Sequence, residues 1–203
     1  MVSMLAMSVI IIVINQTMMR LAGEDGVAAI SIVQYVEELL TAVYLGYSEG
    51  VAPLTSFNHG EGNGEKLSRI YRFSLQIIAG LAICTFLASF PIAGPIVGVF
   101  VAPDTHVYQM AVHGFHIFAV GFLFVGFNTY AASLFTALND GKTSAMLAFC
   151  HTMVFLLGML LLLPRIFGVD GVWIATPIAE FLSLLFSVYF FRAKGRRYRL
   201  AFR

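Results

Sequence analysis

Long apolar stretches recur along this chain, and short polar or glycine-rich turns separate them. Apolar residues make up 59% of the 203 positions, whereas charged residues make up only 11%. So few charges would leave most of the surface of a water-exposed globule of this size without polar cover. A membrane helix needs roughly 20 apolar residues to cross a bilayer core of about 30 Å, and stretches of that length recur here. The sequence therefore predicts an integral, polytopic membrane protein.

The turns divide the chain into six candidate spans. They lie at about residues 3–19, 27–54, 68–101, 108–137, 143–164 and 170–191. Lipid offers no partner for a free backbone group, so spans of this length are expected to be helices. We predict an all-α fold in which residues 1–203 form a single six-helix transmembrane bundle. The third span is too long for one crossing and holds Pro91 and Pro95, so we expect a kink or break near Pro91.

The basic residues predict the orientation in the membrane. If the N-terminus is cytoplasmic, the outer turns carry only Arg20 and Arg165. The inner side then carries all the others, which are Lys66, Arg69, Arg72, Lys142, Arg192, Lys194, Arg196, Arg197, Arg199 and Arg203. By the positive-inside rule, both termini are expected in the cytoplasm of a multi-pass protein of the cell membrane. The first span lacks a basic leader and a cleavage site, so we expect it to remain as a span.

Several function classes find no support in the sequence. A net charge of +1, with basic residues gathered at one terminus, argues against a nucleic-acid partner. Cys84 and Cys150 lie in apolar stretches, so we interpret them as packing residues and not as a disulfide. The stretch GEGNGEKLS lacks the adjacent glycine, lysine and serine or threonine of a phosphate loop, and is interpreted as a turn. Without a metalloprotease or nucleophile motif, we predict no enzyme and no cofactor.

Acids inside the spans are candidate functional residues, because ionisable groups at membrane depth are costly. On the second span Gln34, Glu37, Glu38 and Thr41 form a polar stripe that would face a watery cleft. Adjacent carboxylates point about 100° apart, so only one is expected to serve a given site, and we favour Glu38. The alternative is that Glu37 or Glu38 lies close enough to the outer surface to reach water.

Two further acids have competing interpretations. Glu180 lies in the middle of the last span, three residues after Pro177, whose missing N–H frees a backbone carbonyl. It is either a second ion or substrate site or a buried, hydrogen-bonded structural acid. Glu49 lies near the cytoplasmic end of the second span, where an ion pair with Arg69 or Arg72 is the favoured interpretation.

Three segments carry a resemblance to a known family. They are GYSEGVAPLTSFNHGEGN at 46–63, FNTYAASLFTALNDGKTSA at 127–145 and LPRIFGVDGVWIATPIAEFLS at 163–183. In this order they resemble an inner loop, a helix junction and the last outer turn of the multidrug and toxic compound extrusion (MATE) transporters. The resemblance spans almost the whole chain and corresponds to the C-terminal half of that family.

The resemblance implies an antiporter of twelve helices in two six-helix bundles, driven by sodium ions or protons. It would export amphiphilic, often cationic, drugs or metabolites through a cleft between the bundles. This chain would then need an N-terminal lobe as its partner, and the alternative is a membrane fragment that does not transport. Sodium or a proton would be the coupling ion, at one of the candidate residues.

The chain departs from the family where an acid is commonly found on the first and fourth helices of this bundle. The first span offers Asn15, Gln16 and Thr17, of which we retain Asn15 as a candidate ligand. The fourth span offers His113, His116 and Asn128 but no carboxylate. The two histidines are open to metal binding or proton relay, although packed or near-surface histidines are the favoured interpretation because no third ligand is visible.

Overall fold

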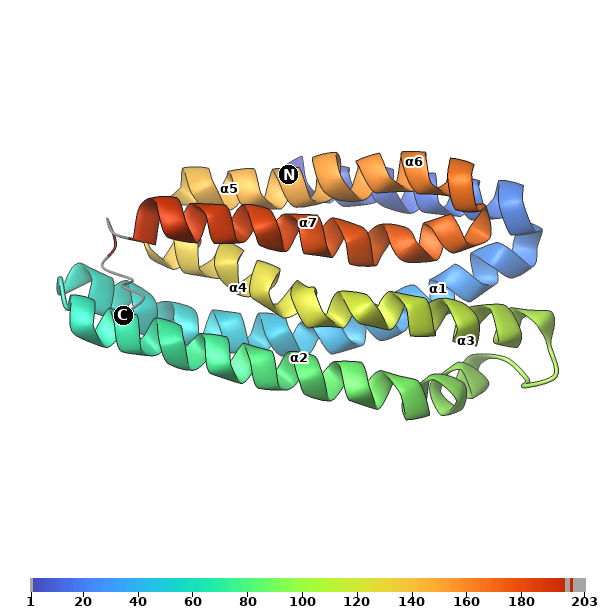
Figure 1. Cartoon of the computed structure of the whole chain (residues 1–203), viewed down its shortest axis with the longest axis horizontal. Coiled ribbons are helices and arrows are strands. Elements are labelled where there is room, and N and C mark those ends of the chain that lie inside the picture. Colours follow the sequence, from blue (N-terminus) through green and yellow to red (C-terminus); the bar gives the residue numbers. More distant parts are fainter. Residues whose placement is uncertain (1, 196–197, 199–203) are drawn as a thin grey trace.

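The computed structural model describes residues 2–195 and Tyr198, with side chains from Ala6 onward. Every regular element in that part of the chain is helical, and the helices run side by side along one long axis (Figure 1). In order they are α1 (Val2–Gly60), α2 (Gly64–Phe100), α3 (His106–Phe118), η1 (Ala119–Gly121), α4 (Phe122–Ala137), α5 (Gly141–Phe149), η2 (Cys150–Leu156), α6 (Leu157–Phe167) and α7 (Val169–Gly195). The predicted all-α architecture is confirmed.

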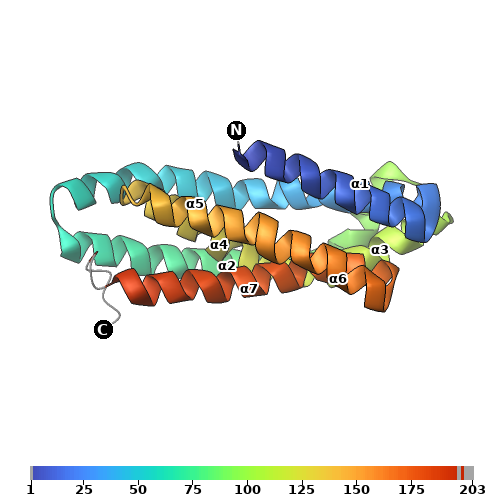
Figure 2. The ribbon, with the colours of Figure 1, turned by 90° about the horizontal axis from the view of Figure 1, so that it is seen from above.

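Five helical stretches are long and apolar enough to cross a membrane. They are Ala6–Gly60, Gly64–Phe100, His106–Ala137, Gly141–Phe167 and Val169–Gly195. The first of them is two helices that meet at Gly23, where φ is 64° and ψ is −152°. Figure 2 shows α1 turning back on itself there, so its two limbs lie antiparallel. The turn predicted around residues 21–26 is therefore a kink centred on one glycine, a residue that adopts positive φ without steric penalty.

Helix starts coincide with short polar residues at the predicted turns. Asn63 caps α2 by accepting a hydrogen bond from the Lys66 N–H at 3.1 Å. Thr105 and Asp140 cap α3 and α5 in the same way. Such side chains satisfy N–H groups that a helix start leaves without partners. Polar residues at the predicted turns therefore mark the starts of α2, α3 and α5.

The sequence predicted a kink or a break near Pro91, and the structure shows no break there. α2 continues through Pro91 and Pro95 and ends at Phe100, after which Val101 is extended with φ of −143°. Proline removes one backbone hydrogen bond, yet membrane helices tolerate it where neighbours or local adjustment satisfy the freed carbonyl. Helix α2 ends two residues before Ala102. Ala102 precedes Pro103, and a proline disfavours helical geometry in the residue before it.

Glycines allow the helices of the core to approach closely. A Cβ atom on Gly114 of α3 would lie 2.4 Å from ring atoms of Trp173 of α7, which is fully buried. A Cβ on Gly126 of α4 would lie 2.5 Å from the ring of Tyr44 of α1. Each aromatic ring occupies the space that the glycine leaves free on the neighbouring helix, so the two helices pack closely at these points.

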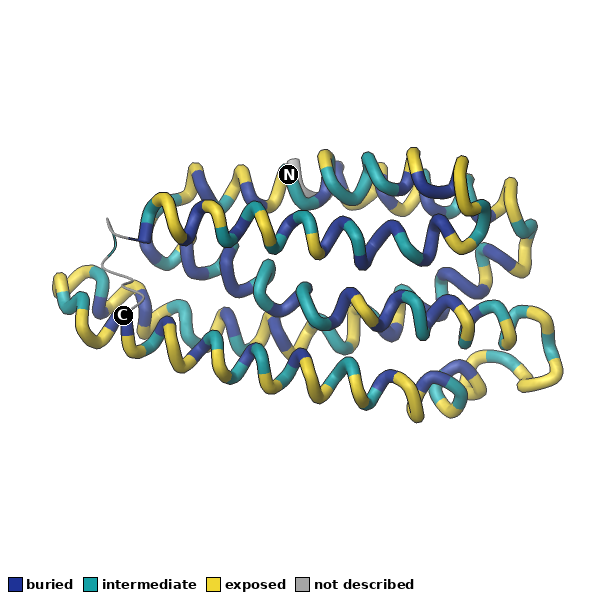
Figure 3. The backbone as a smooth tube through the Cα atoms, in the orientation of Figure 1, coloured by how far each residue is buried: buried dark blue, intermediate teal, exposed yellow. Residues whose placement is uncertain are grey.

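The outside of the bundle is apolar. Figure 3 shows buried residues between the helices and exposed residues on their outer turns. Leu39, Leu87 and Val99 are among the exposed residues, at 70%, 61% and 82% of their full accessibility. Exposed large apolar side chains of this kind are the surface expected next to lipid.

A polar network joins the start of α5 to the end of α7. Asp140 accepts hydrogen bonds from Lys194 Nζ at 2.6 Å and Tyr198 Oη at 3.0 Å, and Thr143 contacts both Asp140 and Lys194. Burial would raise the pKa of Asp140, but the hydrogen bonds from Lys194, Thr143 and Tyr198 outweigh burial and lower it to about 2. The network fixes the end of the last helix against the α4–α5 turn.

The close contact at Gly114 gives a first prediction. Gly114→Ala should lower the free energy of unfolding by about 1–3 kcal/mol, because the new methyl group overlaps the Trp173 ring. Thermal unfolding of the detergent-solubilised protein measures the effect. Gly80→Ala is the control, since a Cβ there meets no atom within 4 Å. Equal melting temperatures for the two variants would contradict the packing described above.

The Asp140 network gives a prediction about pH. A carboxyl whose pKa falls from 3.8 to about 2 on folding adds stability that is complete above its unfolded pKa and is lost as the pH falls towards 2. The difference in melting temperature between wild type and Asp140→Asn should therefore be constant above about pH 5 and shrink between about pH 4 and pH 2. Asp104→Asn, at an exposed acid in the turn before α3, is the control. A difference that does not vary with pH would refute the assignment.

Candidate functional site

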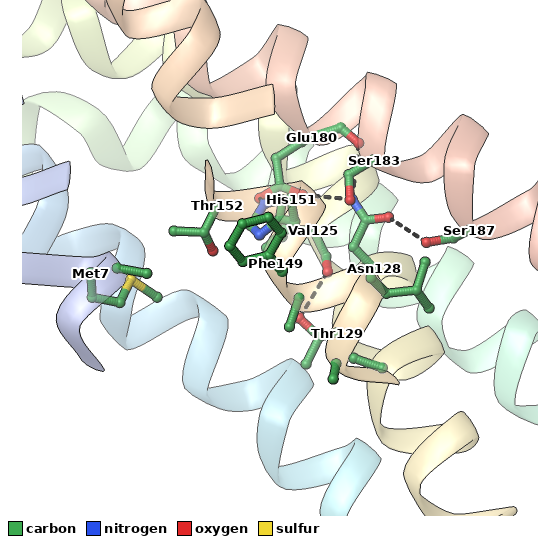
Figure 4. A pocket seen from close by; sticks show the side chains of 15 residues that line it. Met7, Val125, Asn128, Thr129, Phe149, His151, Thr152, Glu180, Ser183 and Ser187 are labelled. Atoms are coloured by element: carbon green, nitrogen blue, oxygen red, sulfur yellow. Dashed lines mark hydrogen bonds and ion pairs between the residues drawn. The ribbon is translucent and has the colours of Figure 1, made fainter. Parts of the chain in front are cut away.

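A cavity of about 310 Å³ lies inside the bundle, among the first limb of α1, α4, α5, η2 and α7. Figure 4 shows its polar side chains pointing towards one another from α4, η2 and α7. The polar residues that line it are Asn128, Thr129, His151, Thr152, Glu180, Ser183 and Ser187. It is a candidate functional site because it combines an internal cavity with ionisable groups.

Glu180 is the centre of this site. It is only 4% exposed, and each of its carboxylate oxygens has a nitrogen partner. Oε1 lies 2.9 Å from His151 Nε2, and Oε2 accepts a hydrogen bond from Asn128 Nδ2 at 2.7 Å. A carboxylate with this little exposure needs such partners, because a buried charge without them is strongly unfavourable.

Asn128 connects the carboxylate to the rest of α7. Its amide nitrogen also donates to the backbone carbonyl of Glu180 at 2.9 Å. Both acceptors belong to Glu180, so the amide must present its NH₂ group there and its oxygen on the other side. That oxygen accepts a hydrogen bond from Ser187 at 3.3 Å. A continuous chain of hydrogen bonds therefore runs from Ser187 through Asn128 and Glu180 to His151.

Local irregularities in the helices position these groups. His151 lies in η2, a π-helical segment between α5 and α6. Wider π turns shift the register of a helix and often occur at functional sites. Pro177 lies within α7 one turn before Glu180 and removes a backbone donor from that helix. The two ionisable partners thus lie at or beside positions where regular α-helical bonding is interrupted.

The structure distinguishes the two adjacent acids of α1. Glu37 is half-buried and interacts electrostatically with Glu180 and His151, whereas Glu38 is exposed. The expectation that only one of them points to a given site agrees with this arrangement. Neither residue lines the cavity around Glu180, and the role of Glu38 as the favoured ligand stays a prediction.

The other predicted ligands lie at separate places. Gln34 and Thr41 are half-buried on the same limb of α1 as Glu37, and Asn15 is half-buried on the other limb. The buried atoms Asn15 Oδ1 and Thr41 Oγ1 have no hydrogen-bond partner among the described residues. None of the three residues lines the cavity around Glu180. Their roles as ion or substrate ligands stay predictions.

Two interpretations of polar residues were wrong. Glu49 is exposed and forms no ion pair with Arg69 or Arg72 within residues 2–195. Glu49 lies on α1, whereas Arg69 and Arg72 lie on α2, beyond the turn between the two helices. Their nearness in the sequence therefore did not bring the charges together. Cys84 is exposed on the surface and does not pack in the core.

The histidines of α3 lie outside the cavity. His113 is exposed and pairs with Asp170 at 3.0 Å, while the ring of His116 stacks on Phe90 at 5.5 Å between centroids. The part of the chain that the structure describes has no group of three or more potential metal ligands. Their arrangement agrees with the interpretation as near-surface and packed histidines.

His151 is the functional candidate that the sequence analysis missed. It is a histidine inside a long apolar run, and like the acids it is ionisable at membrane depth, which is the signal that marks it as a candidate. Its partner is 29 residues away along the chain. Periodicity on one helix could not reveal a pairing between two helices.

Family comparison agrees with this architecture. The MatE family model matches residues 1–162, which is well over half of the chain. This chain belongs to the MatE family. The resemblance carried by the three sequence segments is thereby confirmed. No curated protein matches the sequence.

Several solved structures share the fold of this MatE chain. A multidrug resistance MATE family transporter of the MOP superfamily, in an outward-facing conformation, is 20% identical with a TM-score of 0.89, covering 98% of this chain and 45% of that chain. An inward-facing conformation of such a transporter is 19% identical with a TM-score of 0.89, covering 97% of this chain and 46% of that chain. The Vibrio cholerae MATE transporter VcmN in the bent form is 17% identical with a TM-score of 0.89, covering 100% of this chain and 46% of that chain. This MatE chain spans less than half the length of these structures.

The pairing in the cavity gives a third prediction. His151→Ala in this MatE chain should lower the free energy of unfolding by about 3–5 kcal/mol, because it removes one partner of a buried carboxylate. Denaturant titration in detergent measures the loss. The matched control is His113→Ala, which breaks an ion pair of nearly the same length at an exposed position and should cost less than about 1 kcal/mol. Equal losses would show that the Glu180 pair is not buried as described.

Proposed function

We propose that this chain is one lobe of a cation-coupled antiporter that exports amphiphilic or cationic small molecules across the cell membrane. Membership of the MatE family supports transport as the general role. The single observation that carries the coupling proposal is the buried Glu180 carboxylate, held between His151 and Asn128 at a cavity. Ionisable groups held within the membrane region are typical of ion and proton pathways.

In the proposed topology the chain crosses the membrane six times, and both termini are cytoplasmic. The two limbs of α1 supply two crossings on either side of Gly23, and each of the other four spans supplies one. The α1–α2 turn, the α4–α5 turn and the end of α7 lie at one end of the bundle (Figure 1). Lys66, Lys142 and Lys194 belong to these segments, and such clustering supports a cytoplasmic location for that end.

The proposed coupling ion is a proton. Sodium prefers a shell of several oxygen ligands, whereas both carboxylate oxygens of Glu180 face nitrogen atoms. A carboxylate hydrogen-bonded to an imidazole offers two groups that can gain or lose a proton. Glu37 adds a second carboxylate close enough to interact with both. The number of protons held by this cluster would then change as the lobe meets the two sides of the membrane.

Substrate binding in this proposal requires a second lobe. The chain covers about 45% of the length of the similar structures, so a cleft between two lobes would involve another chain segment. Glu38, Gln34, Thr41 and Asn15 remain proposed ligands for the ion or the solute. The fold agrees equally well with outward-facing and inward-facing relatives. This similarity supports a lobe that moves as one body, with the bound ion favouring one of the two arrangements.

Transport in proteoliposomes tests the proposed role of Glu180. Glu180→Gln should reduce proton-driven dye transport, because the amide cannot carry the proton. We expect a reduction of about 5–150-fold, the factor that corresponds to typical coupling free energies between two sites. Glu65→Gln, at an exposed acid at the start of α2, is the matched control and should transport like wild type. Glu38→Gln is measured beside it under separate sodium and proton gradients.

The assay is run on this chain alone and on the longest reading frame that contains it. Transport by the longer form only would support the need for a second lobe. Proton-driven transport that is unchanged in Glu180→Gln would remove this residue from the coupling site. Transport driven by sodium alone would overturn the proposed ion.

A further inference from the structure

A groove of about 600 Å³ lies on the outside of the bundle, between the end of α1 and the start of α2. Its apolar lining comes from Leu54, Phe57, Ile70 and Phe73. Leu54, Phe57 and Phe73 are 56–64% exposed, so the groove is open towards the surroundings of the bundle. It is separate from the cavity around Glu180, with which it shares no lining residue.

Two cations lie at the end of this groove nearest the α1–α2 turn. Lys66 and Arg69 are exposed in the first two turns of α2, whereas Phe73 follows one turn further along the helix. Neither cation belongs to an ion pair within the described residues. The groove therefore has positive charge at the helix end and an apolar floor further into the span.

This order of charge and apolar surface matches the structure of a phospholipid. The headgroup lies at the membrane interface and the acyl chains extend inward, so one molecule can contact both parts of the groove. We propose that the groove between α1 and α2 binds one anionic phospholipid, with its phosphate at Lys66 and Arg69 and an acyl chain along Phe57, Ile70 and Phe73. This lipid binding does not depend on transport activity. Under the topology proposed above, the bound lipid belongs to the cytoplasmic leaflet.

Net charge decides for an anionic headgroup over a zwitterionic one. The remaining polar residue of the groove, Asn58, is buried and donates its amide to the Leu54 carbonyl at 2.8 Å. Recognition of the headgroup therefore falls to the two cations. Each basic residue near a membrane surface favours an anionic lipid roughly 5.5-fold, so the pair favours it roughly 30-fold. A zwitterionic headgroup carries a quaternary ammonium next to its phosphate, and repulsion between this group and the two cations would offset most of the attraction.

Quenching by brominated lipids tests the site in liposomes that contain the full chain. The reporter is Phe73→Trp, and the one native tryptophan, Trp173, is fully buried and adds a constant background. Brominated phosphatidylglycerol should quench the reporter more strongly than brominated phosphatidylcholine at the same low mole fraction. A second reporter, Leu185→Trp, lies at a similar distance from the same end of the bundle on α7, where it is 52% exposed, and should respond equally to both lipids.

Charge variants then assign the preference to the two cations. Lys66→Gln with Arg69→Gln should remove the roughly 30-fold preference, whereas Arg72→Gln, an exposed cation of α2 outside the groove, should retain it. Soluble glycerol phosphate should not compete, because it lacks the acyl chain. Equal quenching of the Phe73→Trp reporter by the two lipids would overturn the proposal, even if the double variant fails to fold. A preference that survives the double substitution in a folded protein would also overturn it.

Discussion

The absence of hydrogen-bonding partners in lipid governs this structure. Every span must satisfy its backbone groups internally, so the chain forms long helices and restricts departures from helical geometry to a few positions. Gly23, the η1 segment, the η2 segment and Pro177 are such positions in the described chain. Gly23 reverses the chain. The η2 segment and Pro177 instead adjoin the two groups that form the buried Glu180–His151 pair.

The interior of the bundle follows from this constraint. Without water to drive helices together, the packing relies on close contact, and Gly114 against Trp173 and Gly126 against Tyr44 provide it. The same closeness leaves little room for polar groups, and four of them, Ser187, Asn128, Glu180 and His151, are joined in one chain of hydrogen bonds. A buried polar cluster is costly unless its members are hydrogen-bonded to one another.

The sequence predicted the helices well because membrane spans are long and their turns contain capping residues. Asn63, Thr105 and Asp140 are visible in the sequence as polar residues at turns, and the structure uses all three as caps. The position of Glu180 in the last span also identified it as a candidate. Its pairing with His151 was not predictable, because it depends on the register that the π-helical segment imposes between two helices.

The choice between Glu37 and Glu38 shows the same limit. Helical periodicity states that they point in different directions, but it does not say which direction meets the cavity. That answer depends on how the second limb of α1 is rotated, and Tyr44, lodged against Gly126 of α4, contributes to that rotation. This packing contact lies two turns from Glu37 and helps to fix the orientation of the limb that carries both acids. The orientation of this limb thus depends in part on a glycine without a functional group, because a side chain at Gly126 would displace the Tyr44 ring.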